Sequence, residues 1–371
     1  MTDMIAEFYE LAQIDAASGN ERAVADVLTE KLLALGFSVR EDDAGPTFGG
    51  NAGNLIAVLE GTAPGSVMLC SHMDRVANGL GIRPIEKDGF LCTDGSTILA
   101  ADDLAGVCAI LNGVRRTLES GTPHPRIEVV FTVGEESNMW GGRHLDLGML
   151  QSRLCYVLDS PGPIGRVVNN APGRAALKVE VTGRPAHAGN EPEKGINAAH
   201  ILCHILDTLK DGRLDFETVS NFPVISTNCT VCNVVCDKAS ARGEARSRDE
   251  KKLAEYTAYF EAHCQKAADG TGARVSTSVS SDFPSFFIPE SAPVITLARR
   301  ALAEMGIPIR VEAGGGGMDA NFFNAAGLPS LGVATGYTEN HTCDEKLALD
   351  SFSKSGELVQ RLISLCIEPN G

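Results

Sequence analysis

The feature that most constrains this chain is an alternation of short apolar strands with amphipathic helices, which is interrupted once and then resumes. Ser18 and Glu21 fit a capping box at the start of one helix, and a second helix is expected from about Asp103. The apolar strands of this part are expected at residues 55–59, 67–70, 127–133 and 154–158. Strands that are apolar on both faces and alternate with helices predict an α/β fold with a mostly parallel sheet flanked by helices.

The interruption has its own order of elements. We expect strands at residues 176–182, 227–235, 241–247 and 274–280, and helices at 195–209 and 250–268. This βαββαβ order is typical of a small ferredoxin-like domain. The first pattern then returns with a helix near 293–305, a strand at 330–334 and a final helix. The sequence therefore predicts one domain of residues 1–172 and 285–371, with residues 173–284 inserted as a second domain.

Composition excludes several classes of function. The chain has 371 residues, with 48 acidic against 32 basic side chains, and a net charge of -16. Such a surface disfavours nucleic acid and anionic membranes as partners. No apolar run exceeds five residues, and no apolar signal segment is visible near the N-terminus. Eleven scattered cysteines, an odd count, indicate reduced thiols. We expect a cytoplasmic protein without nucleic-acid or membrane partners.

Imidazole and carboxylate side chains follow the ends of several expected strands. They are His72 and Asp74 after 67–70, Glu135 and Glu136 after 127–133, Asp159 after 154–158 and His341 after 330–334, with Asp102 and Asp103 at the start of a helix. The carboxyl ends of strands in an open α/β sheet form the crevice where ligands bind. Two neighbouring divalent metal ions need imidazoles, terminal carboxylates and a bridging carboxylate, while another carboxylate stays free as general base.

Each group also has a simpler interpretation when it is taken alone. An isolated His-x-Asp is usually a surface feature, a pair of acids often begins a helix, and two consecutive glutamates often lie in a solvated loop. The coincidence of all these groups at one expected edge of the sheet favours the metal site.

The same motifs, in this order, resemble the M20 metallopeptidase family. They are Ser-His72-Met-Asp74, Ala-Asp102-Asp-Leu-Ala-Gly106, Gly-Glu135-Glu136-Ser, Leu-Asp159-Ser and Glu-Asn-His341-Thr. Within the family, residues 94–103 and 315–321 are most similar to peptidase T-like proteins. The similarity covers nearly the whole chain, including the inserted domain.

The resemblance implies a role for each motif residue. His72 and Asp159 would hold one Zn²⁺, Glu136 and His341 a second, and Asp102 would bridge the two ions of each subunit; Co²⁺ or Mn²⁺ are alternative metals. Glu135 would be the general base, and Asp74 would orient His72. The resemblance also implies a cis peptide bond after Asp102. One departure is Leu104, which stands where a Lys is common in the family.

The inserted segment is implied to be a lid and dimerisation domain that contacts substrate. His187 lies in the loop after its first expected strand, and Asn233 and Arg246 lie on the next two. In the family, residues at these places bind substrate, and the histidine often reaches into the partner's site of a homodimer. Without the resemblance, these would be a loop histidine, a strand asparagine and one of several exposed arginines.

The predicted function is dinuclear zinc-dependent hydrolysis of short peptides, with removal of the N-terminal residue of tripeptides. A carboxypeptidase and an N-acyl-amino-acid deacylase use the same metal chemistry and stay open as alternatives. Two remoter alternatives are a non-catalytic metal-binding protein and a dinucleotide-dependent oxidoreductase. The latter is suggested by the G-x-G-x-x-A pattern from Gly315 to Ala320, although Asp319 would place a carboxylate beside the pyrophosphate.

Overall fold

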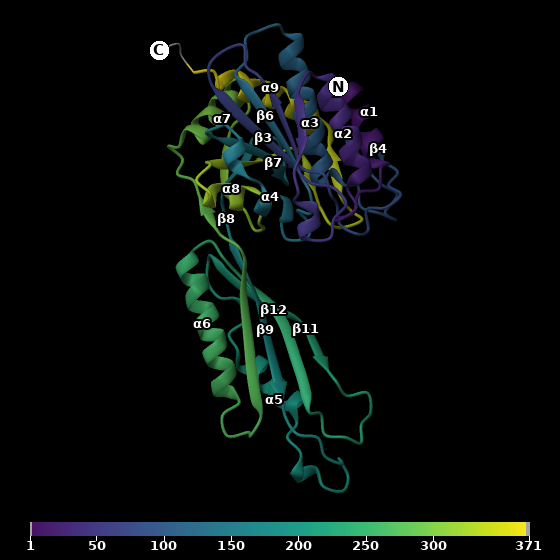
Figure 1. The fold of residues 1–371 in the computed structure, drawn as a ribbon, viewed down its shortest axis with the longest axis vertical. Helices are drawn as coiled ribbons and strands as arrows, with labels where there is room; N and C mark the ends of the chain where they lie inside the picture. Colours follow the sequence, from purple (N-terminus) through teal and green to yellow (C-terminus); the bar gives the residue numbers. More distant parts are fainter. Residues whose placement is uncertain (1, 369–371) are drawn as a thin grey trace. The chain divides into compact units, whose positions relative to one another are not determined.

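The computed structural model describes residues 2–368, and the chain forms two compact units. The first combines residues 2–170 with 287–368, and the second is Ala171–Phe286. Figure 1 shows helices and strands in both units. Each unit is built around a sheet of its own.

A nine-stranded sheet forms the centre of the first unit, in the order β1-β2-β6-β3-β7-β16-β8-β14, with β15 beside β8. The strands are β1 (Ser38–Glu41), β2 (Leu55–Leu59), β3 (Ser66–His72), β6 (Arg126–Thr132), β7 (Cys155–Ser160), β8 (Arg166–Ala171), β14 (Phe286–Phe287), β15 (Arg310–Ala313) and β16 (Ser330–Ala334). The central strands β6, β3, β7 and β16 are parallel. The predicted mostly parallel sheet is confirmed.

Helices flank this sheet because its central strands are buried on both faces. They are α1 (Thr2–Ala12), α2 (Arg22–Ala34), α3 (Ala101–Glu119), α4 (Trp140–His144), α7 (Pro293–Glu304), α8 (Ala320–Ala325) and α9 (Leu349–Leu365). Helix α3 packs against β3 and β7, and α9 packs against α3 and α7. Gly113 permits the close approach of α9, since a β-carbon there would lie 2.4 Å from Val359.

A second, four-stranded sheet in the first unit follows the order β17-β18-β5-β4. Its strands are β17 (Tyr337–Thr338), β18 (Lys346–Ala348), β5 (Phe90–Cys92) and β4 (Ile85–Lys87). His341 lies in the connection between β17 and β18, so the pairing of these two strands fixes both ends of the segment that carries it. Short 3₁₀ turns lie at Gly45–Thr47 and Leu147–Met149.

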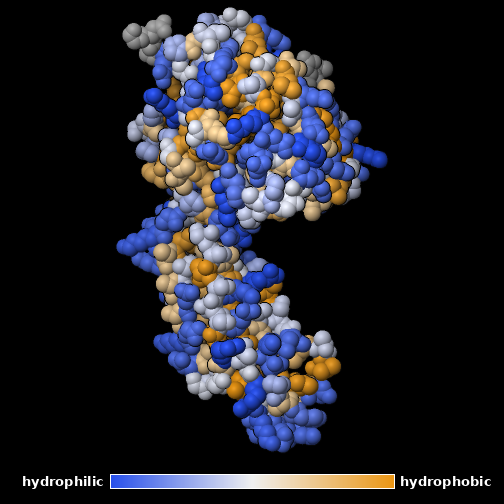
Figure 2. All heavy atoms as spheres, viewed as in Figure 1, coloured by the Kyte–Doolittle hydropathy of each residue, from blue (hydrophilic) through white to orange (hydrophobic). Residues whose placement is uncertain are grey.

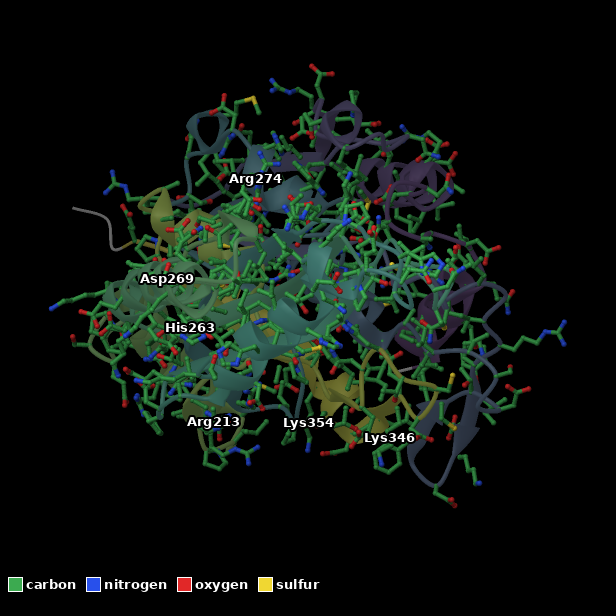
Figure 3. The ribbon with its side chains drawn as sticks, turned by 90° about the horizontal axis from the view of Figure 1, so that it is seen from below. Arg213, His263, Asp269, Arg274, Lys346 and Lys354 are labelled. Carbon is green, nitrogen blue, oxygen red and sulfur yellow. The ribbon has the colours of Figure 1, made fainter. Side chains whose placement is uncertain are left out.

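The second unit has the predicted ferredoxin-like order of elements. They are β9 (Gly173–Thr182), α5 (Ala198–Thr208), β11 (Thr218–Thr227), β12 (Lys238–Ser247), α6 (Glu250–Ala267) and β13 (Arg274–Phe283), with a short β10 (Gly212–Arg213) and a 3₁₀ turn at Pro192–Lys194. The sheet order is β10-β11-β12-β9-β13, and every pair is antiparallel. Both helices pack on this sheet, and His263 of α6, labelled in Figure 3, lies 3.1 Å from the Ile205 carbonyl of α5.

One predicted strand of this unit is wrong. Residues 228–237 form the loop after β11, not a strand, because Asn228 closes the loop at its base. Its side chain accepts from the Lys238 N–H at 3.2 Å and donates to Asp237 at 2.9 Å. The apolar residues of this loop resemble a strand in sequence, although Val231 is 56% exposed. The true strand contains Pro223, and its pairing with β12 is irregular at that point.

The surface is mostly polar, with scattered apolar patches on the face drawn in Figure 2. Within residues 2–368, no helix is both long and apolar enough to cross a membrane.

Candidate active site

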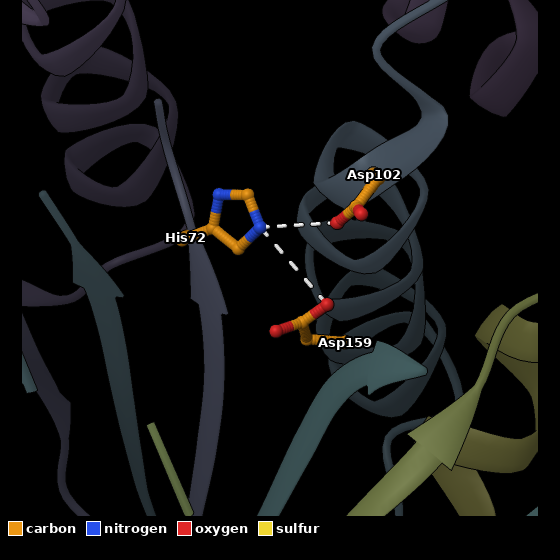
Figure 4. Close-up of side chains that lie close together, drawn as sticks. All are labelled: His72, Asp102 and Asp159. Carbon is orange, nitrogen blue, oxygen red and sulfur yellow. Dashed lines mark hydrogen bonds and ion pairs between the residues drawn. The ribbon is translucent and has the colours of Figure 1, made fainter. Parts of the chain in front are cut away.

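All five predicted metal ligands gather into two overlapping groups in the first unit. In the first group, donor atoms of His72, Asp102 and Asp159 lie within 4.8 Å of one another, and Figure 4 shows these side chains pointing toward each other. In the second group, Asp102 is joined by Glu136 and His341. Asp102 belongs to both groups.

The fold explains why these residues meet. His72 is the last residue of β3 and lies opposite Thr132, the last residue of the parallel neighbour β6. Glu136 follows in the loop after β6, and Asp159 lies near the end of β7 on the other side of β3. Parallel strands end at the same edge of a sheet, so side chains from distant segments converge there.

Asp102 lies between the two imidazoles. Its Oδ1 is 3.1 Å from His72 Nε2, and its Oδ2 is 3.3 Å from His341 Nε2. The Asn340 amide donates to the same Oδ2 at 2.7 Å. His341 Nε2 also lies 3.0 Å from Glu136 Oε2. The peptide bond between Asp102 and Asp103 is cis, which confirms the feature that the family resemblance implied.

Asp74 contacts both predicted functional groups, the ligand His72 and the loop of Glu135. One of its carboxylate oxygens is 3.5 Å from His72 Nδ1, and the Asp74 carbonyl is 3.0 Å from the same nitrogen. The carboxylate accepts the main-chain N–H of Glu135 at 2.9 Å and of Glu136 at 3.2 Å. Burial raises the pKa of Asp74, but the hydrogen bond and charge of His72, with further hydrogen bonds, bring it below its usual value.

Glu135 belongs to neither group of donor atoms among the described residues. Its pKa is raised well above the usual glutamate value, first by burial and then by the charge of Asp159. A carboxylate that lies outside both groups of donor atoms is available to accept a proton.

The site has an excess of buried negative charge. Burial and the charge of Asp102 raise the pKa of Asp159 to about 8. Hydrogen bonds with Asp102 and Glu136 raise the pKa of His341 to about 10. Burial lowers the pKa of His72, yet hydrogen bonds to Asp102 and Asp74 raise it well above the usual histidine value. Several carboxylates and imidazoles here are close enough to share protons. Such a cluster is suited to binding a cation, because the cation would take the place of the protons.

Two residues beside the site, and the contact made by a third, were missed by sequence reasoning. Tyr337 donates its hydroxyl to Asp159 Oδ1 at 3.0 Å. The buried carboxylate of Glu345 accepts the N–H groups of Leu99, Ala100 and Asp102, at 2.8, 2.9 and 3.0 Å. Neither residue stands in a motif with its partner, so only the fold reveals them. Asn340 was noticed as a motif letter, but its hydrogen bond to Asp102 was not.

The predicted capping box is also wrong. Ser18 donates its hydroxyl to Asp74 Oδ2 at 2.5 Å, and Glu21 makes no side-chain cap for α2. Glu21 instead accepts the N–H groups of Gly19 and Gly134, at 2.9 and 3.0 Å. Ser18 and Glu21, which were predicted to cap a helix, therefore form hydrogen bonds with Asp74 and with the Gly134 N–H next to Glu135.

The predicted substrate residues all lie in the second unit. His187 and Asn233 lie on two loops that pair through their main chains, since the Ala188 N–H donates to the Asn233 carbonyl at 2.9 Å. Asn233 is thus a loop residue, and its predicted place on a strand is wrong for the reason given above. Arg246 lies near the far end of β12 and donates to Glu244 at 2.8 Å, so the structure does not bring it beside the other two.

The fold and the two donor groups are those of an α/β protein that could hold metal ions at the carboxyl edge of its sheet. A family model, Peptidase family M20/M25/M40, matches residues 68–365. The uncharacterized protein YqjE of Bacillus subtilis strain 168 is 36% identical over 361 residues, which is 97% of each chain.

Two solved structures share the fold over almost the whole chain. The crystal structure of aminopeptidase PepT from Bacillus cereus ATCC 10987 is 36% identical, with a TM-score of 0.91 and 98% of each chain covered. The crystal structure of a tripeptidase from Staphylococcus aureus subsp. aureus Mu50 is 30% identical, with a TM-score of 0.94. The match covers 99% of this chain and 98% of the tripeptidase chain. The chain belongs to Peptidase family M20/M25/M40 and is a metallopeptidase that hydrolyses peptide bonds.

Proposed function

We propose that this metallopeptidase uses two zinc ions to remove the N-terminal residue of short peptides, in particular tripeptides. The observation that carries the proposal is the position of Asp102 between two imidazoles, in two overlapping donor groups, with Glu135 outside both. The aminopeptidase and the tripeptidase with the same fold support the choice of substrate.

Five side chains would hold the ions. His72 and Asp159 would bind the first, Glu136 and His341 the second, and Asp102 would bridge them; cobalt or manganese would fit the same nitrogen and oxygen donors. When bound, the ions supply Lewis acidity, which polarises a peptide carbonyl and makes water easier to deprotonate.

Glu135 is the general base of the proposed reaction. It takes a proton from the attacking water and then passes that proton to the nitrogen of the leaving amine. Its pKa is raised, first by burial, which favours holding the proton between the two transfers. Asp74 holds the Glu135 main chain and the far side of the His72 ring, so one carboxylate positions both the base and a ligand.

The second unit would act as a lid and dimerisation domain of residues 173–284 beside a zinc-binding domain of residues 1–172 and 285–371. His187 would donate a hydrogen bond to the developing oxyanion, in its own subunit or in a partner's, with Asn233 beside it. Arg246 would bind a substrate carboxylate. The eleven cysteines are all free, which supports a cytoplasmic location.

The test of the proposed chemistry is Glu135→Gln in the zinc-loaded enzyme. Gln keeps the size of the side chain but cannot take a proton, so we expect a loss of kcat of at least about 100-fold. Zinc content should stay at the wild-type value because Glu135 is not a proposed ligand. Glu128→Gln is a matched control, since Glu128 is buried on the strand that leads to Glu135. Unchanged turnover of the Glu135 variant would contradict the mechanism.

The test of the substrate is mass-spectrometric product analysis with one tripeptide in free, N-acetylated and C-amidated forms. An aminopeptidase releases the N-terminal residue from the free and amidated forms only. Cleavage that requires a free C-terminus would indicate the carboxypeptidase alternative, and release of acetate the deacylase alternative. Light scattering of the same preparation tests the proposed homodimer.

A further inference from the structure

The turn that carries Glu135 and Glu136 is held at four consecutive main-chain N–H groups by side-chain oxygens. The N–H of Val133 donates to Asn54 Oδ1 at 3.1 Å, that of Gly134 to Glu21 Oε1 at 3.0 Å, and those of Glu135 and Glu136 to the two oxygens of Asp74 at 2.9 and 3.2 Å. Asp74 already has a part in the proposed mechanism. Glu21 has none, and no sequence motif of the site includes it.

Glu21 is firmly anchored. It is fully buried, and its carbonyl accepts the Ala25 N–H at 2.9 Å in the first turn of α2. The carboxylate oxygen Oε1, which accepts the Gly134 N–H, also accepts the Gly19 N–H at 2.9 Å. Its other oxygen, Oε2, is buried without a hydrogen-bond partner within residues 2–368. Glu21 therefore contacts the turn through one oxygen, and its own main chain is held at the start of α2.

Gly134 is the residue of this turn with the greatest torsional freedom. It has φ +60, and a β-carbon there would lie 2.8 Å from the Phe48 ring, so the position requires glycine. Because Glu135 follows directly, any rotation at Gly134 would displace the Glu135 carboxylate. The hydrogen bond from Gly134 to Glu21 fixes the N–H at this point.

We propose that Glu21 is a positioning residue for Glu135, which it holds in place through the Gly134 N–H. The proposal rests on the role proposed above for Glu135 as general base. Glu21 contacts the turn and not the donor atoms of His72, Asp102, Glu136, Asp159 or His341, so its loss should affect proton transfer and leave zinc bound. Substrate affinity should change little, because the residue that is displaced is the proposed base Glu135 and not a proposed substrate-binding residue.

The test measures kcat and KM of zinc-loaded Glu21→Ala, Glu21→Gln and Glu135→Gln at a temperature where each variant is fully folded. Glu21→Ala should lower kcat about 10- to 100-fold, the scale of a small displacement of a reacting group, with KM within about twofold of wild type. Glu21→Gln keeps an acceptor oxygen for Gly134 and should recover most of the lost kcat. Zinc content should equal that of the wild type in all three.

Glu128→Ala is the matched control for a purely structural effect. Glu128 is also a fully buried carboxylate, and it accepts the N–H groups of Gln151 and Ser152, at 2.9 Å each, at the other end of the sheet from Glu135. It should lose thermal stability with kcat unchanged. The positioning role is overturned if Glu21→Ala keeps wild-type kcat while Glu135→Gln is inactive, or if Glu21→Gln is as impaired as Glu21→Ala. An active Glu135→Gln overturns the proposed function itself, and the role of Glu21 with it.

Discussion

The carboxylate of Asp74 accepts the main-chain N–H of Glu135 at 2.9 Å and lies 3.5 Å from His72 Nδ1. A displacement of Asp74 would therefore move a proposed ligand and the proposed base together. Ser18 adds a third hydrogen bond to the same carboxylate at 2.5 Å, which ties this arrangement to the segment before α2. The two proposed functions of the site, metal binding and proton transfer, would therefore be coupled through one buried side chain.

Asp74→Asn should impair both functions. The neutral amide no longer stabilises the ligating form of His72 and cannot accept both the Glu135 and Glu136 N–H groups, so we expect zinc affinity and kcat each to fall about 10- to 100-fold. Zinc titration against a competing chelator and steady-state kinetics measure the two effects. Asp146→Asn is the control, because the Asp146 side chain accepts the Gly148 N–H in an exposed 3₁₀ turn. A normal zinc affinity in the Asp74 variant would contradict the coupling.

The sequence predicted the residues that are positioned by regular structure. His72 and Asp159 stand at the ends of apolar strands, and such strands become parallel neighbours whose ends coincide. Side chains at those positions must meet whatever the detailed packing is. The periodicity of apolar residues therefore sufficed to locate most of the donor groups.

Contacts made across loops could not be predicted in this way. Glu21 and Gly134 are 113 residues apart, and Glu345 reaches Asp102 across 243 residues. Nothing in the local pattern indicates either partner, and Ser18 with Glu21 fit a helix cap equally well. The misplaced strand at 227–235 has a related cause: its apolar letters match a strand, but the hydrogen bonds of Asn228 form a loop there.

Removal of the Asp159 charge should raise the thermal stability of the metal-free protein and reduce the stabilisation that zinc produces. Burial and the charge of Asp102 raise the pKa of Asp159 from 3.8 to about 8, so its ionisation destabilises the metal-free fold increasingly as the pH rises through this range. Asp159→Asn should therefore raise the Tm of the protein in excess chelator at about pH 9. It should also reduce the rise in Tm that zinc produces, because a ligand charge is lost.

Differential scanning fluorimetry of both forms checks this prediction. Asp269→Asn is the control, since Asp269 is exposed in the second unit and should change neither Tm. A lower Tm of the metal-free Asp159 variant would show that the carboxylate stabilises the fold without a metal.

Tyr337→Phe should weaken zinc binding without disturbing the core. The Tyr337 hydroxyl donates to Asp159 at 3.0 Å, and its loss leaves that proposed ligand less well oriented, for which about a 10-fold loss of zinc affinity is expected. Tyr156→Phe is a matched control: Tyr156 is equally buried, and its hydroxyl donates to the Val294 carbonyl at 3.0 Å. Competition with a chelating dye measures both affinities. Equal effects of the two variants on zinc binding would exclude a specific role for Tyr337.

Glu21→Gln should change the pH dependence of stability as well as test positioning. Burial, and then the charge of Asp74, raise the pKa of Glu21 from 4.5 to about 7. A raised carboxyl pKa means that the folded state favours the protonated form, so stability is lost as the pH rises from 4.5 through about 7. Gln has no such ionisation, and the Tm of Glu21→Gln relative to wild type should therefore increase between about pH 5 and pH 8.

Glu128→Gln provides the opposite case for this measurement. Burial raises the pKa of Glu128, but hydrogen bonds with Ser152 and Arg126 bring it below 4.5. Glu128 is therefore ionised throughout the range from about pH 5 to pH 8, and its stabilising contribution is lost only at lower pH. The Tm difference between Glu128→Gln and wild type should be constant over that range. A constant difference for Glu21→Gln as well would mean that Glu21 does not titrate near neutral pH in the folded protein.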